Sequence, residues 1–331
     1  MTSKQIISFL LIFLGLYSFN RISAQLDTIQ NGYNPKNATS ELNKKRRNFM
    51  LSLGGATYTV GSFALYKTWY EDFPRSGFHF YDDIREWRGL DKAGHMYSTY
   101  SQSKLCYLGW KWTGQGENKA IWSGFACGML FQSTIEIMDG FSQQWGFSWT
   151  DMGANVLGGG LFVAQQKGWG EQRIMLKNSS SKKKYNFYEE GSSQQEILNT
   201  RIQSLYGTGY FQNWLKDYNG QTIWLSANIK SFFPKAPIPN WVNLSIGYGA
   251  ENMIGGYTNQ WEDNDQLIVI DTDLYPRYSQ FYISLDADLS KVKTESPFLR
   301  TVLDVLNVIK IPFSALEINT LGEVKFHLLH F

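Results

Sequence analysis

Residues 91–160 place polar side chains at helical spacing inside segments that are otherwise apolar and rich in small residues. Three pairs have this spacing: Asp91 and His95, Glu136 and Asp139, and Asp151 and Asn155. Residues three or four apart share one face of a helix. Ionisable groups are costly to bury unless they are paired, hydrogen-bonded or bound to a metal ion. We therefore expect antiparallel helices whose polar faces converge near one end of a bundle.

The converged side chains suit two kinds of functional site. In the first, a divalent metal ion is bound by Asp91, His95, Glu136 and Asp139. One histidine among several carboxylates favours Mg²⁺, Ca²⁺ or Mn²⁺ over structural zinc, which prefers cysteine and several histidines. In the second, His95 is a general base oriented by Asp139 or Glu136, and the substrate is a lipid or a glycan. The catalytic set is then His95, Glu136, Asp139 and Asp151.

The same segment also has a structural interpretation. Lys92 can neutralise a carboxylate, Ser148-x-x-Asp151 has the pattern of a capping box, and Asp91 stands where an N-cap residue would. Ser148 is a candidate nucleophile as well, although the sequence around it is not Gly-x-Ser-x-Gly. The glycines at 158–160 lack the lysine and the spacing of a phosphate-binding loop. Close packing of helices explains these glycines better.

The N-terminal residues have the features of a secretory signal. Lys4 gives a positive start, residues 6–17 are an apolar run, and Ala24 is a small residue at a suitable cleavage site. We predict a signal peptide over residues 1–24 and a flexible, Asn-rich leader over 25–47. The alternative is an uncleaved anchor helix, although the run is short for a membrane span. The sequence near Ala24 lacks the cysteine to which a lipid anchor would be attached.

A bundle of about four apolar helices is predicted for residues 48–168. Its helices cover residues 91–112, 119–138 and from 148 to about 166, with glycines in the connections. A further uncharged run, residues 48–66, is either a weak membrane span or a buried helix. The bundle contains Cys106 and Cys127, which an exported protein can join as a disulfide. Buried free thiols are at least as good an explanation, because cysteine often serves as a small core residue.

The composition changes in the second half of the chain. Residues 169–195 contain a Ser-rich and Lys-rich stretch and are predicted to be a linker. Residues 196–331 are predicted to hold a helix, which starts near residue 194 and ends near 216, and an aromatic β-rich region. Its candidate strands are residues 222–231, 241–248, 280–288, 313–317 and 323–329. In residues 281–288 polar and apolar side chains alternate, as in a strand with one buried face. The fold class is therefore α+β, with an antiparallel sheet.

Charge and composition exclude some functions. The net charge is only +2, so a nucleic-acid partner is not expected. A mean hydropathy of −0.31 excludes a conventional polytopic helical membrane protein. Aromatic residues make up 16% of the chain, which suits a membrane interface or carbohydrate contact. The last residues, 326–331, resemble the aromatic C-terminal assembly signal of outer-membrane proteins. An oligomer is possible, since a second copy or a partner could supply further strands.

Residues 48–168 resemble the YfiM-like family of uncharacterised bacterial envelope proteins. The resemblance rests on the motifs Asp91-Lys92-x-x-His95, Glu136-x-x-Asp139-Gly140 and Gly146-Phe147-Ser148-x-x-Asp151. It implies an exported or membrane-associated protein, often a lipoprotein, although the lipid-attachment cysteine is missing here. A more distant resemblance is to the VanZ-like membrane family. The aromatic half resembles an extension in Bacteroidetes envelope relatives.

These observations predict an exported protein at the outer membrane or the periplasmic face of the envelope. Our leading hypothesis is a non-enzymatic structural or interaction component whose partners are membrane lipids or envelope proteins. The alternative is a membrane-associated hydrolase or transferase that acts on lipid or cell-wall glycan through the His/carboxylate cluster. A third possibility is carbohydrate binding by the aromatic strands.

Overall fold

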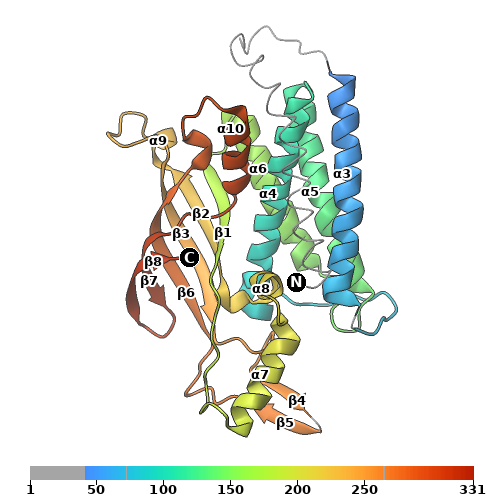
Figure 1. Ribbon diagram of the computed structural model, residues 1–331, viewed down its shortest axis with the longest axis vertical. Helices are drawn as coiled ribbons and strands as arrows, with labels where there is room; N and C mark the ends of the chain where they lie inside the picture. Colours follow the sequence, from blue (N-terminus) through green and yellow to red (C-terminus); the bar gives the residue numbers. More distant parts are fainter. Residues whose placement is uncertain (1–41, 72, 264) are drawn as a thin grey trace.

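The computed structural model describes residues 42–71, 73–263 and 265–331. It has an α+β fold, in which a group of long helices stands beside a curved antiparallel sheet (Figure 1). The predicted signal peptide and nearly all of the predicted leader lie outside the described residues.

The long helices are α3 (Lys44–Leu65), α4 (Leu90–Trp112), α5 (Glu117–Gly140) and α6 (Trp149–Trp169). The last three agree with the predicted helices to within a few residues. The leader prediction was wrong at its end, because α3 begins at Lys44 and its first turn is capped by Asn43, which accepts from the backbone of Arg46. In the part of the chain that the structure describes, the helices are all too short or too polar to cross a membrane, which contradicts the membrane-span interpretation of residues 48–66. The alternative of a buried helix is also wrong, because α3 contains no buried residue.

Small residues set the spacing of the bundle. A side chain at Gly158 would collide with the backbone carbonyl of Met96 on α4, and one at Gly159 would collide with the ring of Phe125 on α5. These two glycines confirm close helix packing. Cys106 on α4 and Cys127 on α5 form a disulfide, which decides between the two alternatives for this pair.

The segment after α6 is not the expected linker throughout. Residues Ile174–Ser180 form β1, an edge strand that pairs with β2 (Gln221–Asn228). Further along, the predicted single helix is divided into α7 (Ser193–Tyr206) and α8 (Tyr210–Lys216). Gly207 interrupts it with a φ of 78°, which a glycine adopts without strain.

The six-stranded sheet has the order β1-β2-β3-β6-β7-β8, and all neighbouring strands are antiparallel. Its remaining strands are β3 (Val242–Glu251), β6 (Tyr278–Ala287), β7 (Phe313–Asn319) and β8 (Val324–His330). The short α9 (Ile229–Phe232) joins β2 to β3, and α10 (Pro297–Leu306) lies between β6 and β7. A separate hairpin contains β4 (Gln260–Asp263) and β5 (Gln266–Val269). The strand predictions found five of these strands approximately but missed β1, β4 and β5.

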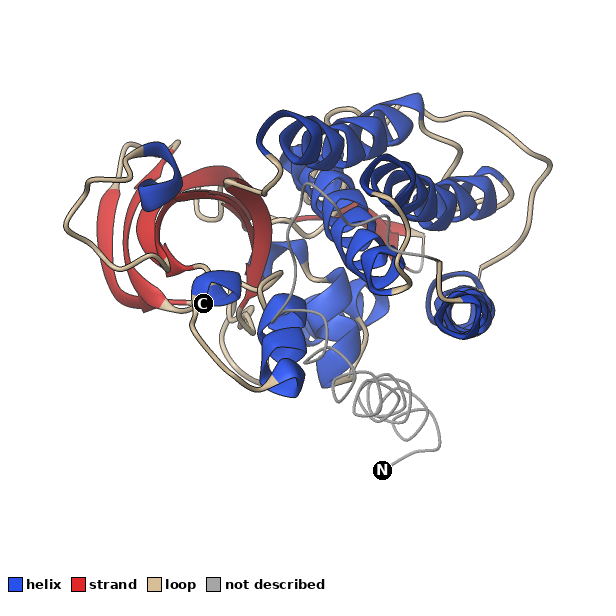
Figure 2. Cartoon of the chain, turned by 90° about the horizontal axis from the view of Figure 1, so that it is seen from above, coloured by secondary structure: helices blue, strands red, loops and turns tan. Residues whose placement is uncertain are grey.

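The sheet curves strongly, as Figure 2 shows, and its two faces differ in chemistry. The curvature brings His330 of β8 to within 3.3 Å of the Thr222 hydroxyl of β2. We call the inner side the concave face and the outer side the convex face. The concave face contains an ion pair between Lys177 and Asp286, whose side chains are both fully buried. The ring of Trp224 is buried beside it.

The convex face is apolar over the middle of the sheet. Strand pairing aligns its outward side chains: Leu225, Leu244, Ile246, Phe281, Ile283, Leu285, Leu316, Ile318 and Phe326. All nine are exposed. The alternation predicted for residues 281–288 is therefore present, but the buried face is the polar one. Such a sheet reverses the usual pattern in water, where one apolar face is covered and a polar face is solvated.

The bundle rests against one margin of the convex face. Leu90 and Tyr100 of α4 belong to the same buried cluster as Leu176 of β1 and Ile223 of β2. Next to this contact, an apolar groove of about 530 Å³ lies between Met96 on α4 and Ile246 and Ile283 of the sheet.

Candidate functional site

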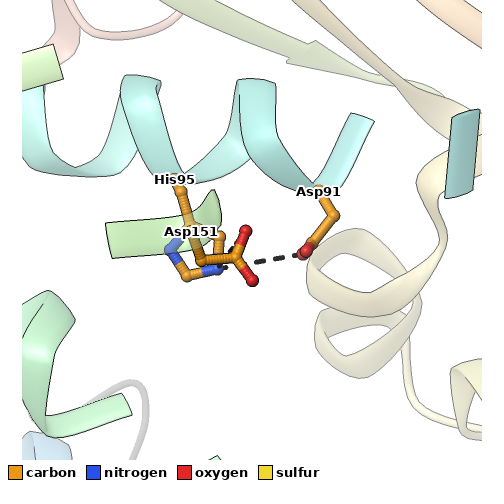
Figure 3. A group of neighbouring side chains, drawn as sticks. All are labelled: Asp91, His95 and Asp151. Atoms are coloured by element: carbon orange, nitrogen blue, oxygen red, sulfur yellow. Dashed lines mark ion pairs between the residues drawn. The ribbon is translucent and has the colours of Figure 1, made fainter. Parts of the chain in front are cut away.

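The first turns of α4 carry the centre of the polar cluster. The helix begins after Gly89, whose φ of 77° marks a sharp turn. Asp91 lies in the first turn, so its predicted role as an N-cap was wrong. His95 follows one turn later, and Asp151 approaches from the first turn of α6. Figure 3 shows the three side chains pointing toward one another, and one potential ligand atom from each lies within 4.8 Å of the others.

Lys92 neutralises carboxylates from three segments. Its ammonium lies 2.7 Å from Asp83, 3.0 Å from Asp91 and 2.8 Å from Asp151. The predicted neutralising role of Lys92 is therefore confirmed. Asp83 was not found from the sequence, because it belongs to an irregular segment before α4 and has no helical spacing to the other residues.

The two ring nitrogens of His95 have different surroundings: Nδ1 faces Asn155, and Nε2 faces the acidic side chains. Its Nδ1 lies 3.1 Å from Asn155 Oδ1, which also accepts a hydrogen bond from Thr99. Because this oxygen is an acceptor, Nδ1 carries the proton and Nε2 faces the carboxylates. The distances from Nε2 are 3.5 Å to Glu136 Oε1 and 3.9 Å each to Asp91 Oδ1 and Asp151 Oδ1.

Glu136 is the most deeply buried carboxylate of the cluster, with a side chain only 1% exposed. Its Oε2 accepts the backbone N–H of Ser148. Its Oε1 has no hydrogen-bond partner among the described residues. A buried acceptor without a donor is unusual and calls for an explanation.

Ser148 is the N-cap of α6, as predicted. Its hydroxyl accepts the N–H of Asp151 and donates to Asp83 at 2.6 Å. The reciprocal half of a capping box is made differently, because Glu136 rather than Asp151 accepts from the Ser148 backbone. The buried Ser148 hydroxyl makes two hydrogen bonds and caps the helix, which argues against a nucleophilic role.

Asp139 lies at the edge of the cluster. Its Oδ1 accepts a hydrogen bond from Tyr70, which follows α3, at 2.7 Å. It is not part of the close group of Asp91, His95 and Asp151. The observed group differs from the predicted ligand set, because it contains Asp151 and lacks both Glu136 and Asp139.

Burial and mutual repulsion separate the pKa values of the carboxyl groups. Burial, with repulsion from Asp151, raises the pKa of Glu136 to about 9. Burial also raises the pKa of Asp139 to about 7 and, together with Asp91, that of Asp151 to about 8. Burial alone would raise the pKa of Asp83, but hydrogen bonds from Asp151, Lys92 and Ser148 outweigh it and hold the pKa at about 2.

The Asp91 pKa is lowered. Burial acts against this direction, and the charges of His95 and Lys92 overcome it. The cluster therefore keeps Asp83 and Asp91 ionised while its other carboxyl groups lose protons only with difficulty.

The cluster opens onto a cavity of about 550 Å³ that lies between the bundle and the second half of the chain. His95, Asp139 and Asp151 contribute to its wall. Aromatic side chains from several segments also line it: Trp69, Tyr70, Trp87, Trp145 and Tyr218. Tyr218, which the sequence did not connect with this site, donates a hydrogen bond of 2.6 Å to Asp91 Oδ1.

These features define an α+β protein with a buried acidic and histidine-containing site beside an inverted sheet. Residues 62–167, which include the cluster residues of α4, α5 and α6, match the model of a family described as "Predicted periplasmic lipoprotein (DUF2279)". Comparison with curated proteins gave no match. Comparison with solved structures gave none either.

Proposed function

We propose that this chain is an exported, non-enzymatic envelope component that attaches to a membrane through the convex face of its sheet, at the outer membrane or its periplasmic side. The observation that carries the proposal is the reversed polarity of the sheet. Leaving a large aliphatic or aromatic side chain in water instead of burying it costs about 1.5–3 kcal/mol. Contiguous exposed apolar patches of this kind mark protein or membrane contacts.

The proposed occupant of the convex face is the acyl region of a lipid bilayer. The face is convex, and its central side chains are hydrocarbon in character, such as Leu244, Ile246 and Ile283. At one end of β2 and β3, the α9 connection adds exposed Phe233 and Trp241. Aromatic residues of this kind favour the membrane–water boundary.

Charge at the same end of the sheet agrees with a lipid partner. The connection between β2 and β3 contains Lys230 and the exposed Lys235. Basic side chains next to an apolar surface are attracted to anionic lipid headgroups, each by about 1 kcal/mol. The match of residues 62–167 to a family described as periplasmic supports an exported location. The YfiM-like and VanZ-like resemblances and the disulfide point in the same direction.

Flotation of the purified full chain with vesicles of phosphatidylethanolamine and phosphatidylglycerol tests the proposal. We expect wild-type protein to float with the vesicles and the double variant Ile246→Lys/Ile283→Lys to lose at least tenfold in partitioning. The matched control is Leu267→Lys/Leu274→Lys, which changes side chains that are at least as exposed and lie outside the six-stranded sheet. Flotation of the double variant as efficient as that of wild type would refute lipid contact through this face. If the protein forms a homodimer and does not float with the vesicles, the convex face is instead a contact with a second copy of the chain.

Cellular location needs a separate experiment. Inner and outer membranes are separated from cells that carry the tagged protein and then washed with alkaline carbonate. Wash-resistant protein in the outer membrane is the expected result. Release by the wash, or recovery in the periplasm, would argue against an embedded sheet.

A second candidate is a hydrolase or transferase that acts on lipid or cell-wall glycan through His95, Glu136, Asp139 and Asp151. The cavity favours it, because His95, Asp139 and Asp151 face a space that admits a small ligand. This candidate predicts that the Asp139→Asn variant folds normally but loses the function of the wild-type protein in the envelope. If Asp139→Asn and His95→Ala lower the Tm equally, and cells show no defect beyond that loss of stability, the enzymatic candidate is rejected.

A further inference from the structure

Carboxyl groups outnumber basic groups where α4, α5 and α6 meet, and a bound cation would displace the protons that burial retains on Glu136 and Asp151. Carboxyl groups of Asp91, Glu136 and Asp151 surround one edge of the His95 imidazole. Lys92 binds Asp91 Oδ2 and also Asp151 Oδ1, while Asp91 Oδ1, which accepts from Tyr218, and Glu136 Oε1 are directed toward His95. Asp151 would therefore be shared between Lys92 and a bound cation. An additional cation would complete this arrangement.

We propose that Asp91, His95, Glu136 and Asp151 bind a divalent metal ion of the oxygen-preferring class, of which Mn²⁺ is the most convenient probe. This inference goes beyond the proposed membrane attachment and does not depend on it. Three of these residues already form a compact group, with potential ligand atoms within 4.8 Å of one another. The fourth, Glu136, provides the independent observation: its buried Oε1 has no hydrogen-bond partner among the described residues and lies 3.5 Å from His95 Nε2.

The spacing suits such an ion. Ligands bound at about 2.0–2.4 Å lie roughly 3–4 Å from one another. The observed separations from His95 Nε2 are 3.5 Å to Glu136 and 3.9 Å each to Asp91 and Asp151. Shifts of a few tenths of an ångström in the carboxylates would bring these atoms into one coordination sphere.

Surrounding hydrogen bonds hold the ligands in position. Asn155 fixes the imidazole through Nδ1, which leaves Nε2 to bind the ion. Tyr218 orients Asp91, and the backbone of Ser148 orients Glu136. Metal ligands are commonly supported by second interactions of this type.

Mn²⁺ binding to the full chain, after EDTA treatment and removal of the chelator, tests the proposal. Electron paramagnetic resonance measures the free and bound ion, and its electron spin echo modulation detects nitrogen bound to Mn²⁺. We expect saturable binding with one nitrogen ligand, loss of the nitrogen signal in His95→Gln, and at least tenfold weaker binding in Glu136→Gln. Asp139→Asn is the control, because Asp139 is hydrogen-bonded to Tyr70 outside the ligand group. We expect a loss of less than threefold there.

The outcomes separate this site from an accidental acidic surface. Bound Mn²⁺ without a nitrogen signal, or equal losses in Glu136→Gln and Asp139→Asn, would overturn the proposed ligand set. No saturation below millimolar Mn²⁺ would overturn the site itself. Circular dichroism of each variant identifies misfolding, and Asp91→Asn replaces any variant that fails to fold. Vesicle flotation is measured separately, so failure of the metal site and failure of membrane attachment are distinguishable.

Discussion

Individual ionisable side chains are buried in two parts of this molecule, around His95 and on the concave face of the sheet. On the concave face, Glu317 accepts from His327 at 2.6 Å, and His330 packs with its ring centroid 4.3 Å from that of Tyr282. Charged groups in such positions require partners because their hydration is lost. Their protonation should therefore be coupled to folding.

His330 provides a measurable case. Burial, reinforced by the positive charges of His327, Lys183 and Lys310, lowers the pKa of His330 to about 4 from its ordinary 6.5. Below pH 6.5 the unfolded chain takes up a proton at this residue while the folded chain does not. Stability is therefore lost as the pH falls from about 6.5 toward 4. After a discount for partial exposure, this contribution is on the order of 1–2 kcal/mol at pH 4.5.

Urea unfolding of wild type and His330→Gln at pH 7 and pH 4.5 measures this contribution. The difference in unfolding free energy between the two proteins should change by that amount, with the variant losing less on acidification. Glu317 attracts the protonated form of His330, and this opposing effect is already included in the pKa of about 4. An unchanged difference between the two pH values would show that His330 is not coupled to folding.

At this scale, spacing along the chain predicted the convergence of Asp91, His95, Glu136 and Asp151. It did not predict which carboxylates are closest, because this depends on how far each helix is rotated. Asp139 is only three residues from Glu136, yet it turns toward Tyr70. Helical spacing could not identify Asp83, because the segment that contains it is irregular.

Among the secondary-structure elements, α6 depends most clearly on its glycines. Gly158→Ala should destabilise the protein by at least about 2 kcal/mol, because the new methyl group collides with the backbone of Met96, which cannot move aside easily. Gly160→Ala is the matched control: no described atom lies within 4 Å of its added carbon. It should stabilise the helix by about 0.5–1 kcal/mol. Thermal unfolding of both variants measures the contrast, and equal effects would contradict the packing of α6 against α4.

The disulfide joins α4 to α5. Cys106 and Cys127 are 21 residues apart, and closing a loop of this length stabilises a protein by about 3 kcal/mol. Cys106→Ala/Cys127→Ala should therefore unfold at lower temperature than the oxidised wild type. A reductant should lower the Tm of the wild type and leave that of the double variant unchanged. Insensitivity of both proteins to reductant would mean that the bond does not form.

Helix positions were predictable because apolar runs, glycines and the Ser148 cap mark their ends. Strand β1 was missed because Lys177 and Ser179 look like linker residues. Both side chains face the concave side, where a lysine can pair with Asp286. The sequence rule that polar stretches are solvated therefore failed at a sheet with a polar interior.

For the whole molecule, the reversed sheet determines behaviour in solution. Without detergent or lipid, the exposed convex face should cause self-association at neutral pH. Ile246→Lys/Ile283→Lys should shift the sedimentation profile toward monomer, whereas Leu267→Lys/Leu274→Lys should not. A wild-type chain that remains monomeric at high concentration without detergent would show that the face is compatible with water.

The sequence could not predict which face of the sheet lies on the concave side. The alternation in residues 281–288 predicts that polar and apolar side chains lie on opposite faces, but either face can be the inner one. Only the curvature that brings His330 to Thr222 assigns the polar side to the interior. This contact joins β2 and β8 through two residues that are 108 positions apart in the chain, so no local pattern predicts it.

The hydrogen bond from Tyr218 to Asp91 crosses between the two halves of the chain. Tyr218 lies outside residues 62–167, the segment that matches the family model. A shorter relative made of the helical segment alone would lack this wall of the cavity and would expose Asp91 to solvent. The C-terminal half therefore forms part of the wall around the polar cluster in addition to carrying the sheet. Substitutions on the two sides of this boundary should consequently be accepted together during evolution rather than one at a time.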